Sequence, residues 1–250
     1  MKPALRIQVV NPNTTASMTA KIAAAARQAA SPGVEIVAVQ PDEGPISIEG
    51  YFDEALSVPG LLEEIARGEG QEFAGHVIAC FDDTGLDAAR CFASAPVVGI
   101  GEAAYHMASL IAGRFSVVTT LSRSVPALEH NLVRYGLASR CSGVRAAEVP
   151  VLELEDPHSS ARDRVSAEID RAIRHDRAEA IVLGCAGMAN LARSLSAEHG
   201  LPVIEGVSSA VRLVESLAAL GLSTSRIGGW ATPRRKPLGG RYAVFSSASS

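Results

Sequence analysis

The stretches Val77-Ile78-Ala79-Cys80 and Val182-Leu183-Gly184-Cys185 share one pattern, in which three apolar or small residues precede a cysteine. Each pattern predicts a short buried strand with the thiol at its carboxyl end. One stretch lies in the first half of the 250-residue chain and the other in the second half. The recurrence predicts two similar halves, each contributing one cysteine at the end of a strand.

Two further pairs of segments repeat in the same order and at nearly the same spacing. Arg6-Ile7-Gln8-Val9-Val10 matches Arg114-Phe115-Ser116-Val117-Val118, and Pro96-Val97-Val98 matches Pro202-Val203-Ile204. Generic alternation of strands and helices can imitate the apolar parts of such a match. It does not explain a cysteine placed just after the equivalent strand in both halves, so we interpret the pattern as an internal duplication.

Short β-branched runs alternate with Ala- and Leu-rich stretches of helical spacing, which is typical of an α/β fold with parallel sheets. We predict two pseudo-symmetric lobes, each with a parallel sheet flanked by helices, that face each other across a ligand-binding cleft. The first lobe comprises residues 1–105 plus 206–235, the second comprises 106–205, and 236–250 form a C-terminal tail. The expected strands are 6–10, 34–39, 75–79, 97–100, 115–119, 143–150, 180–183 and 203–204, and the expected helices include 18–30, 86–91, 165–175, 189–195 and 207–220.

Composition excludes several classes of protein. A net charge of −4 and an aromatic content of 4% argue against nucleic-acid binding. The N-terminus resembles no signal peptide, and no run of apolar residues is long enough to span a membrane, so we expect a cytoplasmic protein without a membrane partner. In a reducing cytosol the four cysteines are expected to be thiols, and their spacing fits no zinc site.

Cys80 and Cys185 are each followed by a segment predicted to open a helix. Amide groups at a helix N-terminus favour an anion, so we expect these thiols to have lowered pKa values. Two such thiols on opposite faces of a carbon acid make a two-base racemase, in which one removes a proton and the other delivers one. The alternative for each cysteine is a small core residue after a buried strand. Cys91 and Cys141 have no equivalent partner and are interpreted as structural.

Loops that follow the first strand of each half are the other candidate walls of the site. Asn11 and Asn13 follow the first strand, and Thr119 and Thr120 occupy the equivalent place in the second half. Their amide and hydroxyl groups suit a polar ligand. Capping of the next helix by Thr14 or Thr15 is the alternative role of the first loop.

Cofactor motifs are weak. The segment 99–104 fits G-x-G-x-x-A, but Leu121 stands where a dinucleotide fold requires an acidic residue, so its glycines are expected to serve a tight turn and close packing. None of Lys2, Lys21 and Lys236 ends a central strand, which argues against a pyridoxal phosphate site. A Cys–His hydrolytic dyad stays open, because its members meet only in space.

Taken together, these segments resemble the Asp/Glu/hydantoin racemase superfamily, and within it the hydantoin racemases. The resemblance spans about residues 5–235 and rests on 9–14, 79–87, 96–100, 115–120 and 182–188. It implies two parallel four-stranded sheets with the active site in the cleft between them, a two-cysteine mechanism without cofactor or metal, and a homo-oligomer. Cys80 and Cys185 match the catalytic cysteines. Asn11, Asn13, Thr119 and Thr120 match the loops that hold the substrate.

The sequence departs from the amino-acid racemase branch beside both thiols. That branch resembles Cys-Asn-Thr and Cys-Thr-His, whereas this chain has Cys80-Phe81-Asp82 and Cys185-Ala186-Gly187. The absence of these polar residues beside the thiols argues against free aspartate or glutamate as the substrate. Phe81, Ala186 and Gly187 suit a cyclic ureide with an apolar 5-substituent, so we expect racemisation of 5-monosubstituted hydantoins.

Three alternatives stay open. The same chemistry on another ureide, such as allantoin, is the nearest. A decarboxylase or cis–trans isomerase of the superfamily is the second, although a decarboxylase needs only one thiol. A ligand-binding protein is the third, because two lobes around a cleft also describe many binding proteins.

Overall fold

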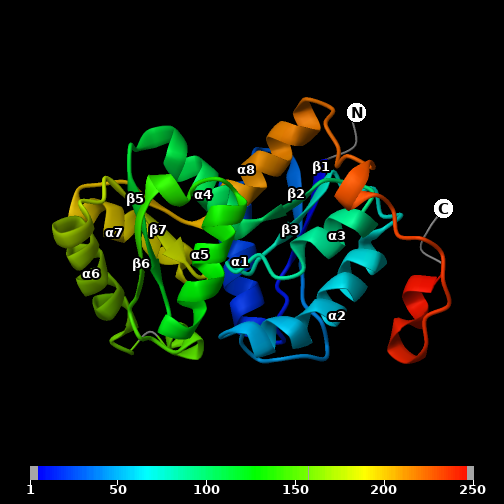
Figure 1. Ribbon diagram of the computed structural model, residues 1–250, viewed down its shortest axis with the longest axis horizontal. Coiled ribbons are helices and arrows are strands. Elements are labelled where there is room, and N and C mark those ends of the chain that lie inside the picture. Colours follow the sequence, from blue (N-terminus) through cyan, green and yellow to red (C-terminus); the bar gives the residue numbers. More distant parts are fainter. Residues whose placement is uncertain (1–4, 157, 247–250) are drawn as a thin grey trace.

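Two four-stranded parallel sheets dominate the computed structural model, which describes residues 5–156 and 158–246 (Figure 1). The strand orders are β2-β1-β3-β4 and β6-β5-β7-β8, so the second sheet repeats the first. This confirms the predicted α/β fold of two similar lobes. The strands are β1 (Leu5–Val10), β2 (Val34–Val39), β3 (Gly75–Ile78), β4 (Val97–Gly99), β5 (Phe115–Thr119), β6 (Cys141–Ala146), β7 (Ala180–Gly184) and β8 (Val203–Ile204).

Helices connect the strands and cover the sheets (Figure 1). The α-helices are α1 (Ala16–Ala29), α2 (Tyr51–Gly68), α3 (Leu86–Phe92), α4 (Ile100–Ile111), α5 (Val125–Arg134), α6 (Ala161–Arg171), α7 (Ala192–His199) and α8 (Gly206–Ala219). Short 3₁₀ segments include η1 (Ser122–Ser124), η3 (Val151–Glu155), η5 (Ala186–Leu191), η6 (Gly228–Trp230) and η7 (Gly240–Ser246).

Apolar spacing explains why these segments take these forms. In α1, Met18, Ile22 and Ala26 recur every fourth residue and are buried, which places one apolar face of the helix against the sheet. The strands β3 and β7 are buried along their whole length. Parallel strands covered by helices on both faces require such uninterrupted apolar runs.

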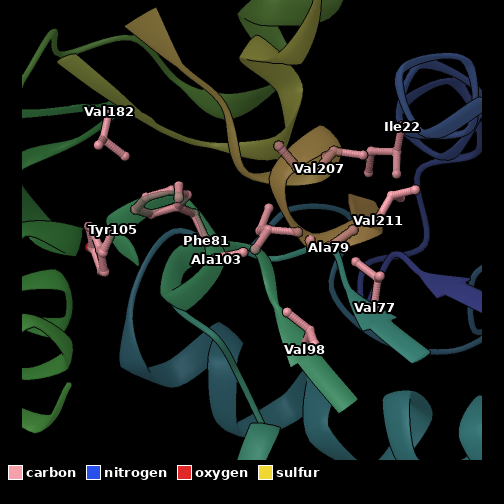
Figure 2. Close-up of a cluster of buried hydrophobic side chains, with 14 of the residues drawn as sticks. Ile22, Val77, Ala79, Phe81, Val98, Ala103, Tyr105, Val182, Val207 and Val211 are labelled. Atoms are coloured by element: carbon pink, nitrogen blue, oxygen red, sulfur yellow. The ribbon is translucent and has the colours of Figure 1, made fainter. Parts of the chain in front are cut away.

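One hydrophobic cluster passes through both lobes. Figure 2 shows Phe81 and Tyr105 beside each other, and their rings meet edge to face with centroids 5.3 Å apart. Tyr105 also stacks on Phe115 of the second sheet at 6.1 Å. Because the loop after Cys80 contributes Phe81 to this shared core, the position of the first thiol is tied to the packing of the second lobe.

Helix α8 follows the second sheet in sequence but packs on the first, against α1, α4, β3 and β4. Glu205 starts it by accepting hydrogen bonds from the N–H groups of Val207 at 2.7 Å and Ser208 at 2.8 Å. At Gly206 a Cβ atom would lie 2.3 Å from the Ile100 carbonyl oxygen, so the close contact between α8 and α4 requires glycine. The residue boundaries proposed for the two lobes and the tail stay a prediction.

Three predicted elements differ from the structure by three or more residues at one end. The strand expected at 143–150 is β6, which ends at Ala146, because its neighbour β5 ends at Thr119 and Glu148 has a left-handed backbone with φ of 54°. The helix expected at 165–175 is α6 followed by a π-helical turn at Ala172–Asp176. The helix expected at 189–195 begins as η5 and becomes α-helical only at Ala192.

Candidate functional site

Cys80 and Cys185 come from different sheets and line one cavity. Cys80 follows β3 by two residues, and Cys185 directly follows β7. Because both strands are central in their sheets and run parallel to their neighbours, their carboxyl ends form the two sides of the cleft. The arrangement can place two thiols around a single bound molecule.

The cavity between the thiols is small, with a volume of about 30 Å³. Sites that enclose small molecules span roughly 300–1,000 Å³, so in this structure the cavity is closed to a ligand of that size. Five of the predicted binding residues line the cavity. The lining consists of Pro12, Asn13, Met18, Ile48, Ala79, Cys80, Phe81, Asp82, Thr119, Thr120, Ser124, Val151, Gly184, Cys185 and Ala186.

The two thiols have equivalent backbone donors. The backbone N–H of Asp82 donates to Cys80 Sγ, and that of Gly187 donates to Cys185 Sγ. In both cases the donor lies two residues after the cysteine. Cys80 Sγ also lies 3.4 Å from the hydroxyl oxygen of Thr84. These donors favour a thiolate. Because the backbone donor recurs at the equivalent position in both halves, the internal duplication includes a hydrogen bond to each sulfur atom.

Burial outweighs these donors in this closed state. It raises the pKa of Cys185 to about 12 and that of Cys80 well above its ordinary value, and the negative charge of Asp82 raises both pKa values further. The expected lowering of the two thiol pKa values is therefore wrong for the closed cavity. Neither thiol lies in the first turn of a regular α-helix, because α3 begins only at Leu86 and Cys185 precedes the 3₁₀ segment η5.

Asn11 and Asn13 hold the loop after β1 in a fixed shape. Asn11 Nδ2 donates to Asn13 Oδ1 and to Thr19 Oγ1, both at 2.9 Å. Asn13 Oδ1 also accepts from the N–H of Thr15 at 2.9 Å. Asn13 reaches the cavity wall, whereas Asn11 lies behind it as a buried support.

Thr15 occupies the residue before α1, but its side chain does not cap the helix. Its hydroxyl donates instead to the carbonyl of Ile46 at 2.6 Å, and the N–H of Thr14 donates to the carbonyl of Pro45 at 3.0 Å. Helix capping, the alternative role of these threonines, is therefore wrong. Their bonds fasten the segment that carries Ile48 into the cavity wall.

Thr119 and Thr120 are buried at the equivalent place in the second sheet, and both line the cavity. The Thr119 hydroxyl donates to the Gly184 carbonyl at 2.9 Å, which joins β5 to the residue before Cys185. A Cβ atom at Gly184 would lie 2.8 Å from the Thr119 Cβ, so glycine permits this contact. Thr119 thus positions the second thiol.

The residues beside the thiols take different places. Phe81 and Ala186 are buried and line the cavity. Gly187 stands behind Cys185, where an added Cβ would lie 3.7 Å from Sγ and 3.0 Å from Leu154 Cδ1. The structure therefore brings Phe81 and Ala186 to the cavity wall, while Gly187 contributes its backbone N–H to the thiol.

The glycines of segment 99–104 make room for Asp83. An added Cβ would lie 2.1 Å from Asp83 Oδ1 at Gly99, and 2.8 Å from Asp83 Oδ2 at Gly101. The buried carboxylate accepts from the N–H of Gly101 at 2.9 Å and from that of Glu102 at 2.7 Å, which caps α4. The glycines thus serve close packing around a side-chain cap, as the sequence predicts.

Several cavity residues were missed by sequence reasoning. Ile48 lies in the segment that connects β2 to α2, and Val151 lies in the equivalent segment that connects β6 to α6. Glu49 Oε1 accepts from the N–H of Val151 at 3.0 Å, which joins these segments across the mouth of the cleft. Ser124 belongs to the hydroxyl-rich stretch that follows β5, but it was not among the predicted binding residues. Connections of this kind carry no periodic pattern from which their position can be predicted.

A larger cavity of about 1,060 Å³ lies between α2 and the segment that ends the described chain. Five acidic and three basic side chains line it, and some of them form ion pairs. Arg241 pairs with Glu63 at 3.1 Å, and Glu64 forms an ion pair with Arg67. None of the residues selected from the sequence lines this cavity, so the candidate site is the smaller cavity between the thiols.

Two absences hold for residues 5–156 and 158–246. These residues provide no group of three or more His, Cys, Asp or Glu side chains that could hold a metal ion. Across the same ranges, no helix combines the length and the apolar character needed to cross a membrane.

Comparison with known proteins assigns the family. The model of the Asp/Glu/hydantoin racemase family matches residues 7–214. The hydantoin racemase of Rhizobium meliloti is 47% identical over 94% of this chain and 98% of its own length. The hydantoin racemase of Pseudomonas sp. (strain NS671) is 45% identical over 96% of this chain and 97% of its own length.

Solved structures agree with this assignment. The allantoin racemase of Klebsiella pneumoniae superimposes with a TM-score of 0.95 and 51% identity, covering 97% of this chain and 99% of that one. Matches of this extent include both sheets, both thiol-bearing loops and α8. The chain therefore belongs to the Asp/Glu/hydantoin racemase family and is a racemase.

Proposed function

We propose that the protein racemises 5-monosubstituted hydantoins at C5 through Cys80 and Cys185, without a cofactor. One observation carries the proposal: two thiols that end equivalent strands of the two sheets line a single cavity. A lone thiol in such a position would suit many roles. Two thiols that are related by the internal duplication suit a reaction that must work equally well on both faces of one carbon.

The proposed reaction transfers protons at two faces. One cysteine, as thiolate, removes the C5 proton, and the electron pair delocalises into the adjacent ring carbonyl. The other cysteine, as thiol, delivers its proton to the opposite face of C5. In the reverse direction the two exchange roles, which is consistent with their equivalent backbone donors, Asp82 and Gly187.

The raised thiol pKa values indicate how the active base arises. In the closed cavity both thiols are neutral at pH 7, because burial raises the pKa of each. A ring enters only when the walls separate, and water then reaches the sulfur atoms and reduces the penalty of ionisation. The two backbone donors are already in place to stabilise the thiolate that forms.

The cavity wall supports a cyclic ureide as substrate. Met18, Ile48, Phe81 and Val151 form apolar surfaces that suit a 5-substituent. Asn13, Thr120 and Ser124 add polar groups that can meet ring carbonyl and N–H groups. We propose Asn13, Thr119, Thr120, Phe81 and Ala186 as residues that shape the ring site, with Asn11 and Gly187 behind them.

Allantoin is the second candidate substrate. It is a hydantoin whose 5-substituent is a ureido group, so C5 chemistry is the same. Allantoin racemases of Klebsiella pneumoniae and Pseudomonas fluorescens, at 51% and 43% identity, have TM-scores of 0.95 and 0.91 with this chain. This similarity favours allantoin as strongly as the sequence relatives favour the other hydantoins.

Parallel assays separate the two substrates. Purified protein without added cofactor is incubated in D₂O with L-5-benzylhydantoin or with one enantiomer of allantoin. Circular dichroism follows optical activity, and proton NMR follows the C5 signal. We expect loss of optical activity with deuterium incorporation above the chemical background, and the ratio of kcat/KM values identifies the preferred ring. Absence of both changes with both compounds would contradict the proposed function.

A further inference from the structure

The cavity wall contains a carboxyl group that the proton transfer does not use. Asp82 lines the cavity together with both thiols. Its charge raises the pKa of Cys80 and also that of Cys185, so one carboxyl group acts on both sulfur atoms. A charge that interacts with both thiols also interacts with a molecule bound between them.

Asp82 is paired with a second acid. The carboxyl groups of Asp82 and Glu54, which lies in the first turn of α2, are hydrogen-bonded to each other. Two carboxyl groups can form such a bond only if one of them carries a proton. Burial raises the pKa of both groups, and their mutual repulsion raises that of Asp82 further. In a hydrogen-bonded pair of carboxyl groups, one proton is shared and one negative charge remains, because ionisation of both groups would place two like charges side by side.

Glu54 Oε1 is shielded from solvent, and apart from the carboxyl group of Asp82 no N–H or O–H donor in the described ranges reaches it. The charges of Glu49 and Glu155 also raise the pKa of Cys185, but each of these acids has a partner of its own. Glu49 accepts from the N–H of Val151 at 3.0 Å, and Glu155 is paired with Lys21 at 3.0 Å. Of these acids, Asp82 is the one whose side chain lines the cavity between the thiols.

We propose that the Asp82–Glu54 pair makes the cavity selective for neutral carbon acids and excludes substrates that carry a carboxylate. The inference rests on the proposed racemisation and specifies its substrate class. A neutral ureide enters without repulsion, and its N–H groups can donate to the carboxylate. Amino acids, malonates and ring-opened carbamoyl amino acids bring a second negative charge into a poorly solvated cavity. At a separation of about 6 Å, repulsion of this kind weakens binding on the order of 10- to 100-fold.

Two nearly isosteric substrates test the selectivity. Hydantoin-5-acetamide is neutral and hydantoin-5-acetate is anionic, and both carry a C5 proton. The measured quantity is the ratio of their kcat/KM values for racemisation. We expect the wild-type protein to prefer the amide by at least about tenfold. Racemisation of the amide verifies the proposed function separately, and its absence would contradict both that function and the inference.

Variants in which an amide replaces each carboxyl group test whether the pair causes the preference for the neutral substrate. Because the pair carries one charge, D82N and E54Q each leave that charge on the remaining carboxylate, so each should retain most of the preference. The double variant D82N/E54Q is neutral and should lose it, with the ratio falling at least about tenfold. D42N/E43Q, which removes two exposed carboxyl groups, is the control and should keep the wild-type ratio.

Circular dichroism verifies that each variant is folded. If D82N/E54Q is not folded, D82S/E54Q removes the same two carboxyl groups and replaces it in the test. A wild-type preference that persists unchanged in the folded double variant would overturn the inference. Equal racemisation of both substrates by the wild-type protein would overturn it as well.

Discussion

Cys80 and Cys185 end strands of two different sheets, line the same cavity, and each accept a backbone N–H from the residue two positions later. The repetition of sequence that places a cysteine after each strand thus also places a donor beside each sulfur. Equivalence of this kind is what racemisation requires, because the forward and reverse reactions use the same groups in exchanged roles.

The first prediction concerns the two thiols. Replacement of either Cys80 or Cys185 by serine should lower racemisation about a hundred- to ten-thousandfold, because a serine hydroxyl is a far weaker acid than a thiol. Circular dichroism should show an unchanged fold. Cys91→Ser is the matched control, since that thiol contacts the Gly229 carbonyl at 3.4 Å and lies outside the cavity. Near wild-type activity in C80S or C185S would contradict the two-base mechanism.

The second prediction concerns the ionisation of the thiols. Burial raises the pKa of Cys185 to about 12 and that of Cys80 well above its ordinary value. Only a thiolate reacts with iodoacetamide, so the rate of alkylation in the free enzyme should rise about tenfold per pH unit between pH 7 and pH 9. Mass spectrometry of C91S/C141S protein measures the two remaining thiols. A rate that is already constant above pH 7 would show that a thiolate exists in the free enzyme.

The third prediction concerns a bond between the lobes. The hydroxyl of Tyr135 donates to Asp83 Oδ2 at 2.7 Å. Burial raises the pKa of Asp83 from 3.8 to about 7, so its own contribution to stability is fully present below pH 3.8 and is lost as the pH rises through 7. Tyr135 opposes this loss, because its hydroxyl stabilises the ionised carboxylate and lowers the pKa of Asp83.

Tyr135→Phe should therefore lower the free energy of unfolding by about 1–2 kcal/mol, with a larger effect at pH 8 than at pH 5. Urea denaturation at both pH values measures the difference. The same loss at both values would show that the bond does not depend on the charge of Asp83.

The fourth prediction concerns Gly101. An added Cβ would lie 2.3 Å from the Phe81 carbonyl oxygen, in the loop that carries Cys80. Gly101→Ala should lower the free energy of unfolding by about 1–3 kcal/mol and reduce kcat, because the loop must move to make room. Gly229→Ala is the control, since no atom lies within 4 Å of its added Cβ. Wild-type stability and activity in G101A would show that the loop adapts freely.

Much of the fold could be predicted because its signals are local or repeated. Apolar runs marked the strands, and the duplication placed Cys80 and Cys185 at equivalent positions. The errors lie where tertiary neighbours decide the structure. Strand β6 ends when β5 ends, which no property of the residues after Ala146 reveals. The thiol pKa values depend on burial by side chains from other segments, which outweighs the nearby backbone donors.

The site could be predicted only in part for the same reason. Five of the proposed binding residues reach the cavity because they adjoin strand ends, where ligands of parallel sheets bind. Ile48 and Val151 arrive from irregular connections whose course is set by bonds such as that between Glu49 and Val151. The pairing of Asp82 with Glu54 joins a loop to a helix distant in sequence, so no spacing rule indicates it.

The most direct test of the two-cysteine mechanism is where deuterium first appears. Enantiomerically pure substrate, 5-benzylhydantoin or allantoin as the first assays select, is incubated with the enzyme in D₂O, and the reaction is stopped after a few per cent conversion. The enantiomers are then separated on a chiral column and analysed by mass spectrometry. Two monoprotic thiols on opposite faces predict deuterium in the product enantiomer and almost none in the remaining substrate. Equal early incorporation into both enantiomers would show that one base serves both faces, and would contradict the account.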